Sequence, residues 1–299
     1  MTKHNKKYLI LITVALVTLS GCAHKSFMQC ACEKQNKSQN TVIGNTEPEK
    51  AWKVLNSDVV KFFQEKKYKE ATDVAQKALK FATEKLPPNH PYIATSLNNL
   101  GEIYRSQNKL ADAELFHKKA LEVRKVSLGK DHPDVATDLH NLASIYLSEG
   151  KFDLAEPLFK QALGIWKKAL GKENPTVVNC LNNLAELYKA KAKYPDSELI
   201  YKQVLKIREK TLGKENPLVA ETLNNLATVY YAEEKYDLAE SLLNQSLSIL
   251  EKGLGKNNPD IAGILDNIAD FYKNTGKFEK AKSFQERANA IRKNKVKES

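Results

Sequence analysis

The sequence predicts an all-α solenoid of about six helix pairs, and three regularities predict it. An Xaa-Pro step recurs every 42 residues, at His90-Pro91, His132-Pro133, Asn174-Pro175, Asn216-Pro217 and Asn258-Pro259. A polar triplet keeps the same interval, at Asn98-Asn99-Leu100, His140-Asn141-Leu142, Asn182-Asn183-Leu184, Asn224-Asn225-Leu226 and Asp266-Asn267-Ile268. One tyrosine does so too, at Tyr104, Tyr146, Tyr188, Tyr230 and Tyr272. A fixed period of this length indicates stacked repeats, each of which buries its apolar face against its neighbours.

Each repeat carries the boundary signals of two helices. Asparagine before proline favours the start of the first helix, since asparagine caps well and proline needs no partner at the first helical position. A small residue in the second helix allows close packing, at Ala113, Ala155, Ser197, Ala239 and Ala281. That helix is expected to end at a glycine with positive φ, at Gly129, Gly171, Gly213 and Gly255.

The predicted order of segments begins with an export signal. Residues 1–21 have a basic start, a short apolar run and small residues, as a signal peptide does, and the run is too short to span a bilayer comfortably. Residues 22–50 are polar and are expected to form a flexible tether. A degenerate helix pair follows over 51–90, then five regular repeats over 91–294 and a polar tail over 295–299.

The end of the signal, Leu19-Ser20-Gly21-Cys22, resembles the bacterial lipoprotein box. The resemblance implies cleavage before Cys22 and a lipid on its thiol, so that the acyl chains anchor the protein in a membrane. The alternative is an ordinary signal peptide with a chance cysteine. Because Ala23 follows Cys22, the same resemblance favours the periplasmic side of the outer membrane, if the organism is Gram-negative.

Composition limits the partners and the redox chemistry. The formal charge is +11; a moderate excess of this kind fits an anionic partner or simply solubility. No pattern of aromatic and basic residues suggests a nucleic acid. Four cysteines are too few for a disulfide framework. Cys30 and Cys32 are expected to be unpaired or intermolecular, and Cys180 to be a packing residue.

The repeats at 51–294 resemble tetratricopeptide repeats, and most closely the 42-residue repeats of kinesin light chains. The shared pattern is Leu-Gly-Lys-Xaa-Asn/His-Pro-Xaa-Val-Ala, then Leu-Asn-Asn-Leu-Ala and the tyrosine. The resemblance implies a right-handed superhelix whose first helices line a concave groove that binds a protein or peptide. The export signal excludes a role with a cytosolic motor.

The resemblance further implies that the second asparagine of each triplet grips the backbone of a ligand. An amide offers a donor and an acceptor, which match a peptide unit. The alternative is that these asparagines bond neighbouring repeats and set their stacking. The candidate groove residues are Asn98, Asn99, Asn141, Asn182, Asn183, Asn224, Asn225, Asn267, Arg105, Leu147, Lys189 and Tyr231.

Charges in this groove are mixed, because acids and bases lie three residues apart and can pair on one helix face, as in Glu102/Arg105 and Asp270/Lys273. This favours an extended peptide with apolar anchors, contacted by Leu147 and Tyr231, over an acidic one.

No phosphate loop, nucleophile motif or metal-spaced set of histidines and cysteines occurs. The sequence therefore predicts a non-enzymatic protein without a cofactor or metal. The first interpretation is a lipid-anchored adaptor of the cell envelope that binds a protein or peptide in its groove. The second is a structural or assembly subunit of an envelope complex, in which the convex and edge surfaces make the contacts.

Overall fold

The structure is a computed structural model and describes residues 46–298. The expected signal peptide, residues 22–45 of the expected tether and the cysteines Cys22, Cys30 and Cys32 lie outside the described residues. Within residues 46–298, none of the helices combines the length and the apolar character needed to cross a membrane.

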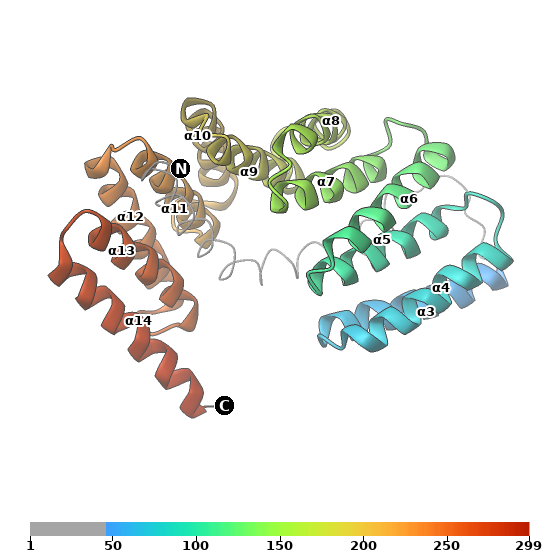
Figure 1. Ribbon diagram of the computed structural model, residues 1–299, viewed down its shortest axis with the longest axis horizontal. Helices are drawn as coiled ribbons and strands as arrows, with labels where there is room; N and C mark the ends of the chain where they lie inside the picture. Colours follow the sequence, from blue (N-terminus) through green and yellow to red (C-terminus); the bar gives the residue numbers. More distant parts are fainter. Residues whose placement is uncertain (1–45, 299) are drawn as a thin grey trace. The chain divides into compact units, whose positions relative to one another are not determined.

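The described chain is helical throughout and has no strand (Figure 1). The first helices of the pairs are α3 (Glu47–Gln64), α5 (Pro91–Ser106), α7 (Pro133–Ser148), α9 (Pro175–Ala190), α11 (Pro217–Ala232) and α13 (Ala262–Asn274), the last preceded by the short 3-10 helix η1 (Pro259–Ile261). The second helices are α4 (Tyr68–Lys85), α6 (Leu110–Leu128), α8 (Phe152–Leu170), α10 (Tyr194–Leu212), α12 (Tyr236–Leu254) and α14 (Phe278–Glu298). The predicted all-α solenoid of six helix pairs is confirmed.

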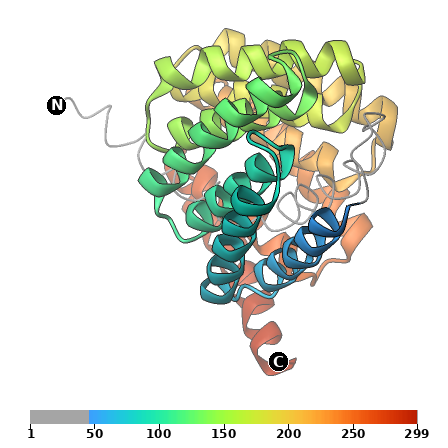
Figure 2. The same ribbon diagram turned by 90° about the vertical axis from the view of Figure 1, so that its right-hand side faces the viewer.

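The chain forms two compact units that divide within α9, an N-terminal unit up to Leu187 and a C-terminal unit from Tyr188. The two helices of a pair contact each other in α3 and α4, α5 and α6, α7 and α8, α11 and α12, and α13 and α14. A second helix packs on the first helix of the following pair in α4 on α5, α6 on α7, α10 on α11 and α12 on α13. In Figure 2 the pairs of the N-terminal unit lie in succession, α3 and α4 beside α5 and α6.

The predicted boundary signals act as expected. The residue before each proline caps its helix, and its side chain accepts the backbone N–H two residues later at 2.8–3.2 Å, in His90, His132, Asn174, Asn216 and Asn258. The glycines after the second helices have φ values of 82–86°, where an L side chain is strained. The small residue of each second helix is buried, from Ala113 to Ala281.

The ends of the helical region differ from the sequence prediction. Helix α3 begins at Glu47, before the apolar pattern at Ala51, because Thr46 and Glu49 form a reciprocal capping box and Pro48 stands in the first turn. At the other end, α14 continues to Glu298 through the expected polar tail. Lysine and glutamate are good helix formers, and no glycine or proline stops the helix there.

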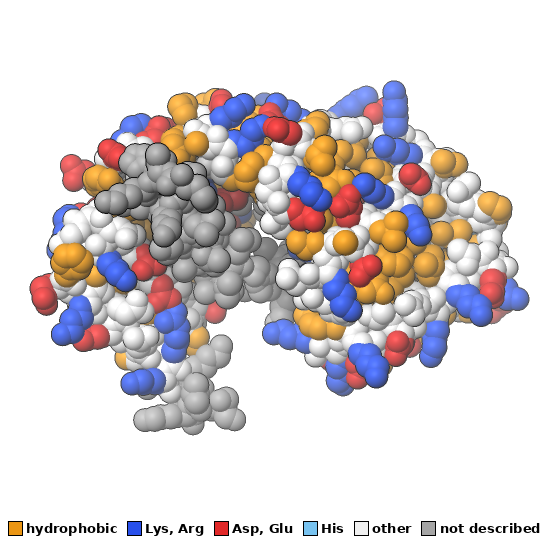
Figure 3. All heavy atoms as spheres, viewed as in Figure 1, with side chains coloured by type: hydrophobic (Ala, Val, Ile, Leu, Met, Phe, Trp, Pro, Cys, Tyr) orange, Lys and Arg blue, Asp and Glu red, His pale blue; other side chains and the backbone are white. Residues whose placement is uncertain are grey.

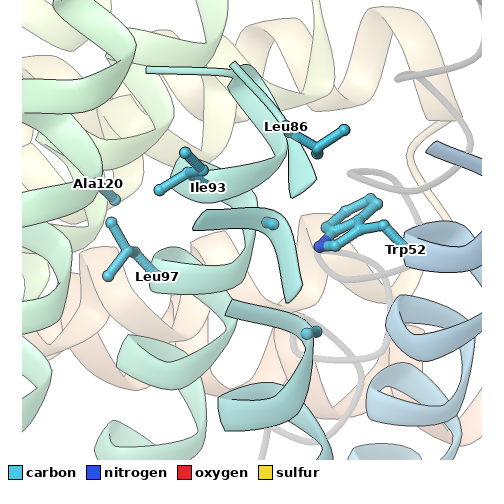
Figure 4. Packing of buried hydrophobic residues seen from close by; sticks show 7 residues of the cluster. Trp52, Leu86, Ile93, Leu97 and Ala120 are labelled. Carbon is cyan, nitrogen blue, oxygen red and sulfur yellow. The ribbon is translucent and has the colours of Figure 1, made fainter. Parts of the chain in front are cut away.

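The N-terminal unit shows how a degenerate first pair is held. Trp52 is 2% exposed; its ring stacks on Tyr92 with centroids 4.0 Å apart, and its indole N–H donates to Ser96 Oγ at 2.9 Å. Figure 4 shows Trp52 reaching from α3 toward α5, where Ile93 and Leu97 face Ala120 of α6. A large aromatic side chain thus joins the first pair to the first regular repeat.

At Gly101 in α5 a neighbouring side chain leaves no room for a Cβ atom. The equivalent residue in the later repeats is Ala143, Ala185, Ala227 or Ala269. A Cβ atom at Gly101 would lie 2.7 Å from Nε2 of His117, whose side chain is fully buried. Only a residue without a side chain leaves room for the imidazole, so Gly101 and His117 are matched to each other.

We therefore expect Gly101→Ala to destabilise the protein although alanine is the better helix former. The clash costs about 1–3 kcal/mol, which exceeds the ~1 kcal/mol that alanine contributes in a helix interior. The measurement is the free energy of urea unfolding.

Gly164→Ala is the matched control, because Gly164 is also helical but a Cβ there has no neighbour within 4 Å. That variant should be neutral or more stable by up to ~1 kcal/mol. An equal response of the two variants would contradict the steric account, whereas the double variant Gly101→Ala/His117→Ala should lose less stability than the sum of the single changes.

Candidate functional site

The asparagine triplets lie on the first helices, and their amides join one repeat to the previous one. In Asn99, Asn141, Asn183 and Asn267 the second asparagine donates a side-chain N–H to the residue 43 positions earlier, which is the first polar residue of the preceding triplet or, for Asn99, the equivalent Asn56. We call this row of bonds the amide ladder. Its bonds are Asn99 Nδ2 to Asn56 Oδ1 at 2.7 Å, Asn141 Nδ2 to Asn98 Oδ1 at 2.9 Å and Asn267 Nδ2 to Asn224 Oδ1 at 3.2 Å. Asn56 therefore plays the first asparagine's part in the degenerate pair, although no full triplet occurs there.

His140 takes the first asparagine's place in the ladder. Its Nε2 lies 2.9 Å from Nδ2 of Asn183. Because the amide nitrogen can only donate, this bond requires a neutral imidazole that carries its proton on Nδ1. The ring packs on Phe159 and Trp166, with centroids 5.4 Å away in both cases. Burial lowers the pKa of His140 to about 4, which keeps it neutral at physiological pH.

The candidate groove residues differ in exposure along the chain. Asn98, Asn99, Asn141 and Asn224 are buried, whereas Asn182, Asn183, Asn225, Asn267, Arg105, Leu147, Lys189 and Tyr231 are partly exposed. The second asparagine is thus buried in the first two regular repeats and accessible in the later three. The structure shows that the ladder bonds neighbouring repeats; ligand binding by these residues stays a prediction.

Of the acid–base pairs expected on the first helices, Glu102 and Arg105 do pair, with Oε2 and Nη2 2.6 Å apart. Glu102 is only 3% exposed and its other oxygen lies 3.4 Å from Nε2 of His117. Burial would raise the pKa of Glu102, but Arg105 and His117 outweigh it and hold the pKa well below its usual range. Asp270 and Lys273, by contrast, make no ion pair with each other or with any residue in the described part of the chain.

The two predicted apolar anchors and Lys189 have different surroundings. Lys189 Nζ donates to Thr228 Oγ1 of the next repeat at 3.2 Å. The Tyr231 ring lies 5.7 Å from the Tyr236 ring and 6.0 Å from the Phe271 ring, centroid to centroid. Leu147 is partly exposed at the end of α7. The structure therefore brings Tyr231 into an aromatic cluster, while Lys189 contacts its neighbouring repeat.

Sequence reasoning missed a buried ion pair between consecutive repeats. Arg124 Nη1 lies 2.8 Å from Asp138 Oδ1, and both residues are almost completely buried. Burial raises the pKa of Asp138 to about 6, and the Arg124 guanidinium only partly opposes this. The sequence signal that could have found it is the spacing of 14 residues between the arginine and its partner, because Arg208 bonds Thr222 at the same separation.

A cluster around the periodic tyrosine was also missed. The hydroxyl of Tyr146 donates to Glu114 at 2.9 Å, and the equivalent bonds join Tyr230 to Glu198 at 3.1 Å and Tyr272 to Glu240 at 2.8 Å. A lysine from the turn lies over each ring, 5.5–5.7 Å from the centroid, in Lys151, Lys235 and Lys277. The turn lysines before the second helices thus stabilise the repeats themselves.

Cys180 is fully buried, with its Sγ 3.6 Å from the carbonyl oxygen of Phe159, and burial raises its pKa to about 12. It is the packing residue that the sequence predicts. In residues 46–298 no group of three or more histidine, cysteine or acidic side chains could hold a metal ion.

We expect His140 to make the fold sensitive to acid. Its folded-state pKa of about 4 lies below the ordinary value of 6.5, so the unfolded chain binds the proton first. Stability contributed by neutral His140 is therefore complete above pH 6.5 and is lost as the pH falls toward 4, by roughly 3 kcal/mol at 1.36 kcal/mol per pKa unit.

His140→Asn supplies the residue that stands at this place in Asn98, Asn182 and Asn224. The variant should show a flatter dependence of the unfolding free energy on pH between 7 and 4 than the parent chain. His132→Asn serves as the control, because Asn174 and Asn216 cap the equivalent helices. Parallel curves for the parent and His140→Asn would refute the role assigned to His140.

Comparison with known proteins identifies the family to which these helix pairs belong. Residues 93–134, 116–168, 134–210 and 218–294 match the tetratricopeptide repeat family. No curated protein matches the chain.

Several solved structures share the fold. A putative kinesin light chain from Podosopora anserina, with nearly identical repeats, is 23% identical, with a TM-score of 0.62 over 70% of this chain and 98% of its own. BtubC (BKLC) from P. vanneervenii is 23% identical, with a TM-score of 0.60 over 84% of this chain and 93% of its own. The type IV pilus biogenesis factor PilW is 15% identical, with a TM-score of 0.61 over 80% of this chain and 93% of its own.

The helix pairs of this chain agree with these matches, and the tetratricopeptide repeat fold is one that supports binding of protein partners. The chain belongs to the tetratricopeptide repeat family.

Proposed function

We propose that the protein is a non-enzymatic adaptor that binds an extended segment of a partner protein along the amide-bearing faces of its first helices. A lipid on Cys22 holds it at a membrane of the cell envelope. The lipoprotein box in the sequence supports the anchor, and the partly exposed amides of the later repeats support the binding face.

Asn267 carries the argument for the binding face. One N–H of its amide donates to Asn224, and its carbonyl oxygen accepts no hydrogen bond from any residue between 46 and 298. The side chain is partly exposed. The amide therefore keeps one donor and one acceptor for a ligand while it holds the repeat in register, so the structural and the binding role are compatible.

The neighbouring side chains suit an extended peptide. On α11 the partly exposed residues Asn225, Thr228 and Tyr231 follow one another at intervals of three, and so lie along one helix face. The Asn225 amide can bond the backbone of a peptide, and Tyr231 offers an apolar contact for one of its side chains.

The second candidate function is that of an assembly subunit that uses its outer surfaces. Second helices carry exposed apolar side chains, with Leu115 48%, Leu199 69% and Leu238 51% exposed. In the N-terminal unit an open depression of about 410 Å³ is lined by apolar side chains of α4, α5 and α6, including Leu79 and Phe116. Figure 3 shows hydrophobic side chains among the charged ones over this part of the molecule.

Photocrosslinking separates the two functions. A benzophenone amino acid at Thr228 probes the amide-bearing face of the C-terminal unit, and one at Leu199 in α10 is the control on a second helix of the same unit. In native membranes we expect a specific adduct from position 228 and none from position 199. Adducts from position 199 alone would contradict the adaptor and support the assembly subunit.

The lipid anchor has its own test. Cys22→Ser removes the only thiol in the lipoprotein box, and with it the acyl chains that contribute about 0.8 kcal/mol per buried methylene. We expect the variant to move from the membrane fraction to the soluble fraction, as seen by immunoblotting. Cys30→Ser, in the same polar segment, should leave fractionation unchanged. If Cys22→Ser stays with the membrane, the lipid on Cys22 is not the anchor.

A further inference from the structure

In the C-terminal unit the ammonium of Lys189 occupies a position between two first helices, where it contacts Thr228. The ammonium of Lys189 in α9 donates to Thr228 Oγ1 in α11 across a separation of 39 residues. Because the repeats keep a constant register, contacts recur 42 residues later. The tyrosine–glutamate bonds Tyr230–Glu198 and Tyr272–Glu240 show this recurrence within the same unit.

One repeat later the equivalent residues are Tyr231 for Lys189 and Asp270 for Thr228. At this second place a tyrosine stands where the first place has the lysine, and a carboxylate stands where the first place has a hydroxyl. The ring contact of Tyr231 with Phe271, at 6.0 Å between centroids, places Tyr231 of α11 against this part of α13.

The carboxylate of Asp270 has no hydrogen-bonded or ion-paired partner within the described chain. Asp270 is partly buried. Asp266, one turn earlier, is instead paired with Arg292 and accepts from Gln285 at 3.0 Å. Burial raises the pKa of Asp270, and the neighbouring charge of Asp266 adds to this while Lys273 opposes it. A carboxylate in such surroundings gains from a cation supplied from outside.

The ring of Tyr231 adds a second group that can attract a cation. Tyr231 contacts both Tyr236 and Phe271, so its ring is held in place by its neighbours. The face of a tyrosine ring attracts an ammonium or a guanidinium, and a carboxylate beside it pairs with the same group. Lysine and arginine side chains also have apolar stems that can lie along such rings.

We propose that Asp270 and Tyr231 form a binding site for one basic side chain, lysine or arginine, of the extended segment that the adaptor binds. This inference rests on the proposed function and adds the chemical class of the ligand. In the preceding repeat the cation at this position is Lys189 of the protein itself. At the proposed site the cation comes from the ligand. The partly exposed amide of Asn267, one turn before Asp270 on α13, lies beside it to hold the backbone of the same segment.

The test is a selection of random nine-residue peptides displayed on phage against the folded mature chain. The parent chain should enrich arginine or lysine at one fixed position of the bound peptides. Replacing that residue by glutamine in a synthetic selected peptide should weaken binding about five- to tenfold, as expected for a partly buried charge pair with a ring contact.

Three variants assign the preference to this site. Asp270→Asn keeps the shape and removes the charge, so the basic preference should disappear. Tyr231→Lys copies Lys189 and supplies an internal cation to Asp270, so it should abolish the preference. Tyr231→Phe keeps the ring and is the matched control, which should retain the preference.

The outcomes separate this inference from the proposed function. If peptides are enriched without a basic preference, or if Asp270→Asn keeps the preference, the site is refuted and the peptide-binding function stands. If no peptide is enriched on the parent chain, the peptide-binding function and this site are both refuted. Loss of the preference in Asp270→Asn and Tyr231→Lys but not in Tyr231→Phe supports the site.

Discussion

The hydrogen bond between the asparagines of successive first helices fixes how the repeats stack within each unit. Apolar contacts alone tolerate small shifts of one helix past another, since the hydrophobic effect has no direction. An amide bond such as Asn141 to Asn98, at 2.9 Å and buried, tolerates very little, because a shifted helix would leave both amides without a partner. The ladder therefore specifies the register that brings together the other contacts across neighbouring repeats.

Once the register is set, the residue pairs that meet at equivalent positions between neighbouring repeats can differ in chemistry. The position that holds the ion pair of Arg124 and Asp138 holds Arg208 and Thr222 in the C-terminal unit. The position of Lys189 and Thr228 becomes Tyr231 and Asp270 one repeat later. A constant backbone with variable pairs is how a repeat protein can create one distinct site without changing its fold.

Much of the fold could be predicted because its signals are local. Asn216 before Pro217 marks a helix start, and Gly213 marks a helix end, whatever the rest of the chain does. The small buried residues such as Ala155 follow from the same period. The burial of Glu102 against His117 could not be predicted in this way, because a helical wheel places Glu102 on the polar side of α5, and only the packing of α6 brings a fully buried imidazole to it.

The sequence by itself determined the repeat, its helix boundaries and the row of amides, since each depends on residue type and spacing along the chain. Tertiary structure alone decided how those amides are used. Asn99 and Asn141 are buried in bonds to their neighbours, whereas Asn267 remains partly open. It also decided that Glu102 forms an ion pair with Arg105 while Asp270 forms none with any described residue, although both acids lie three positions before a base. The physical reason is that burial and pairing depend on what a neighbouring helix places opposite a side chain, which residue spacing along one helix does not encode.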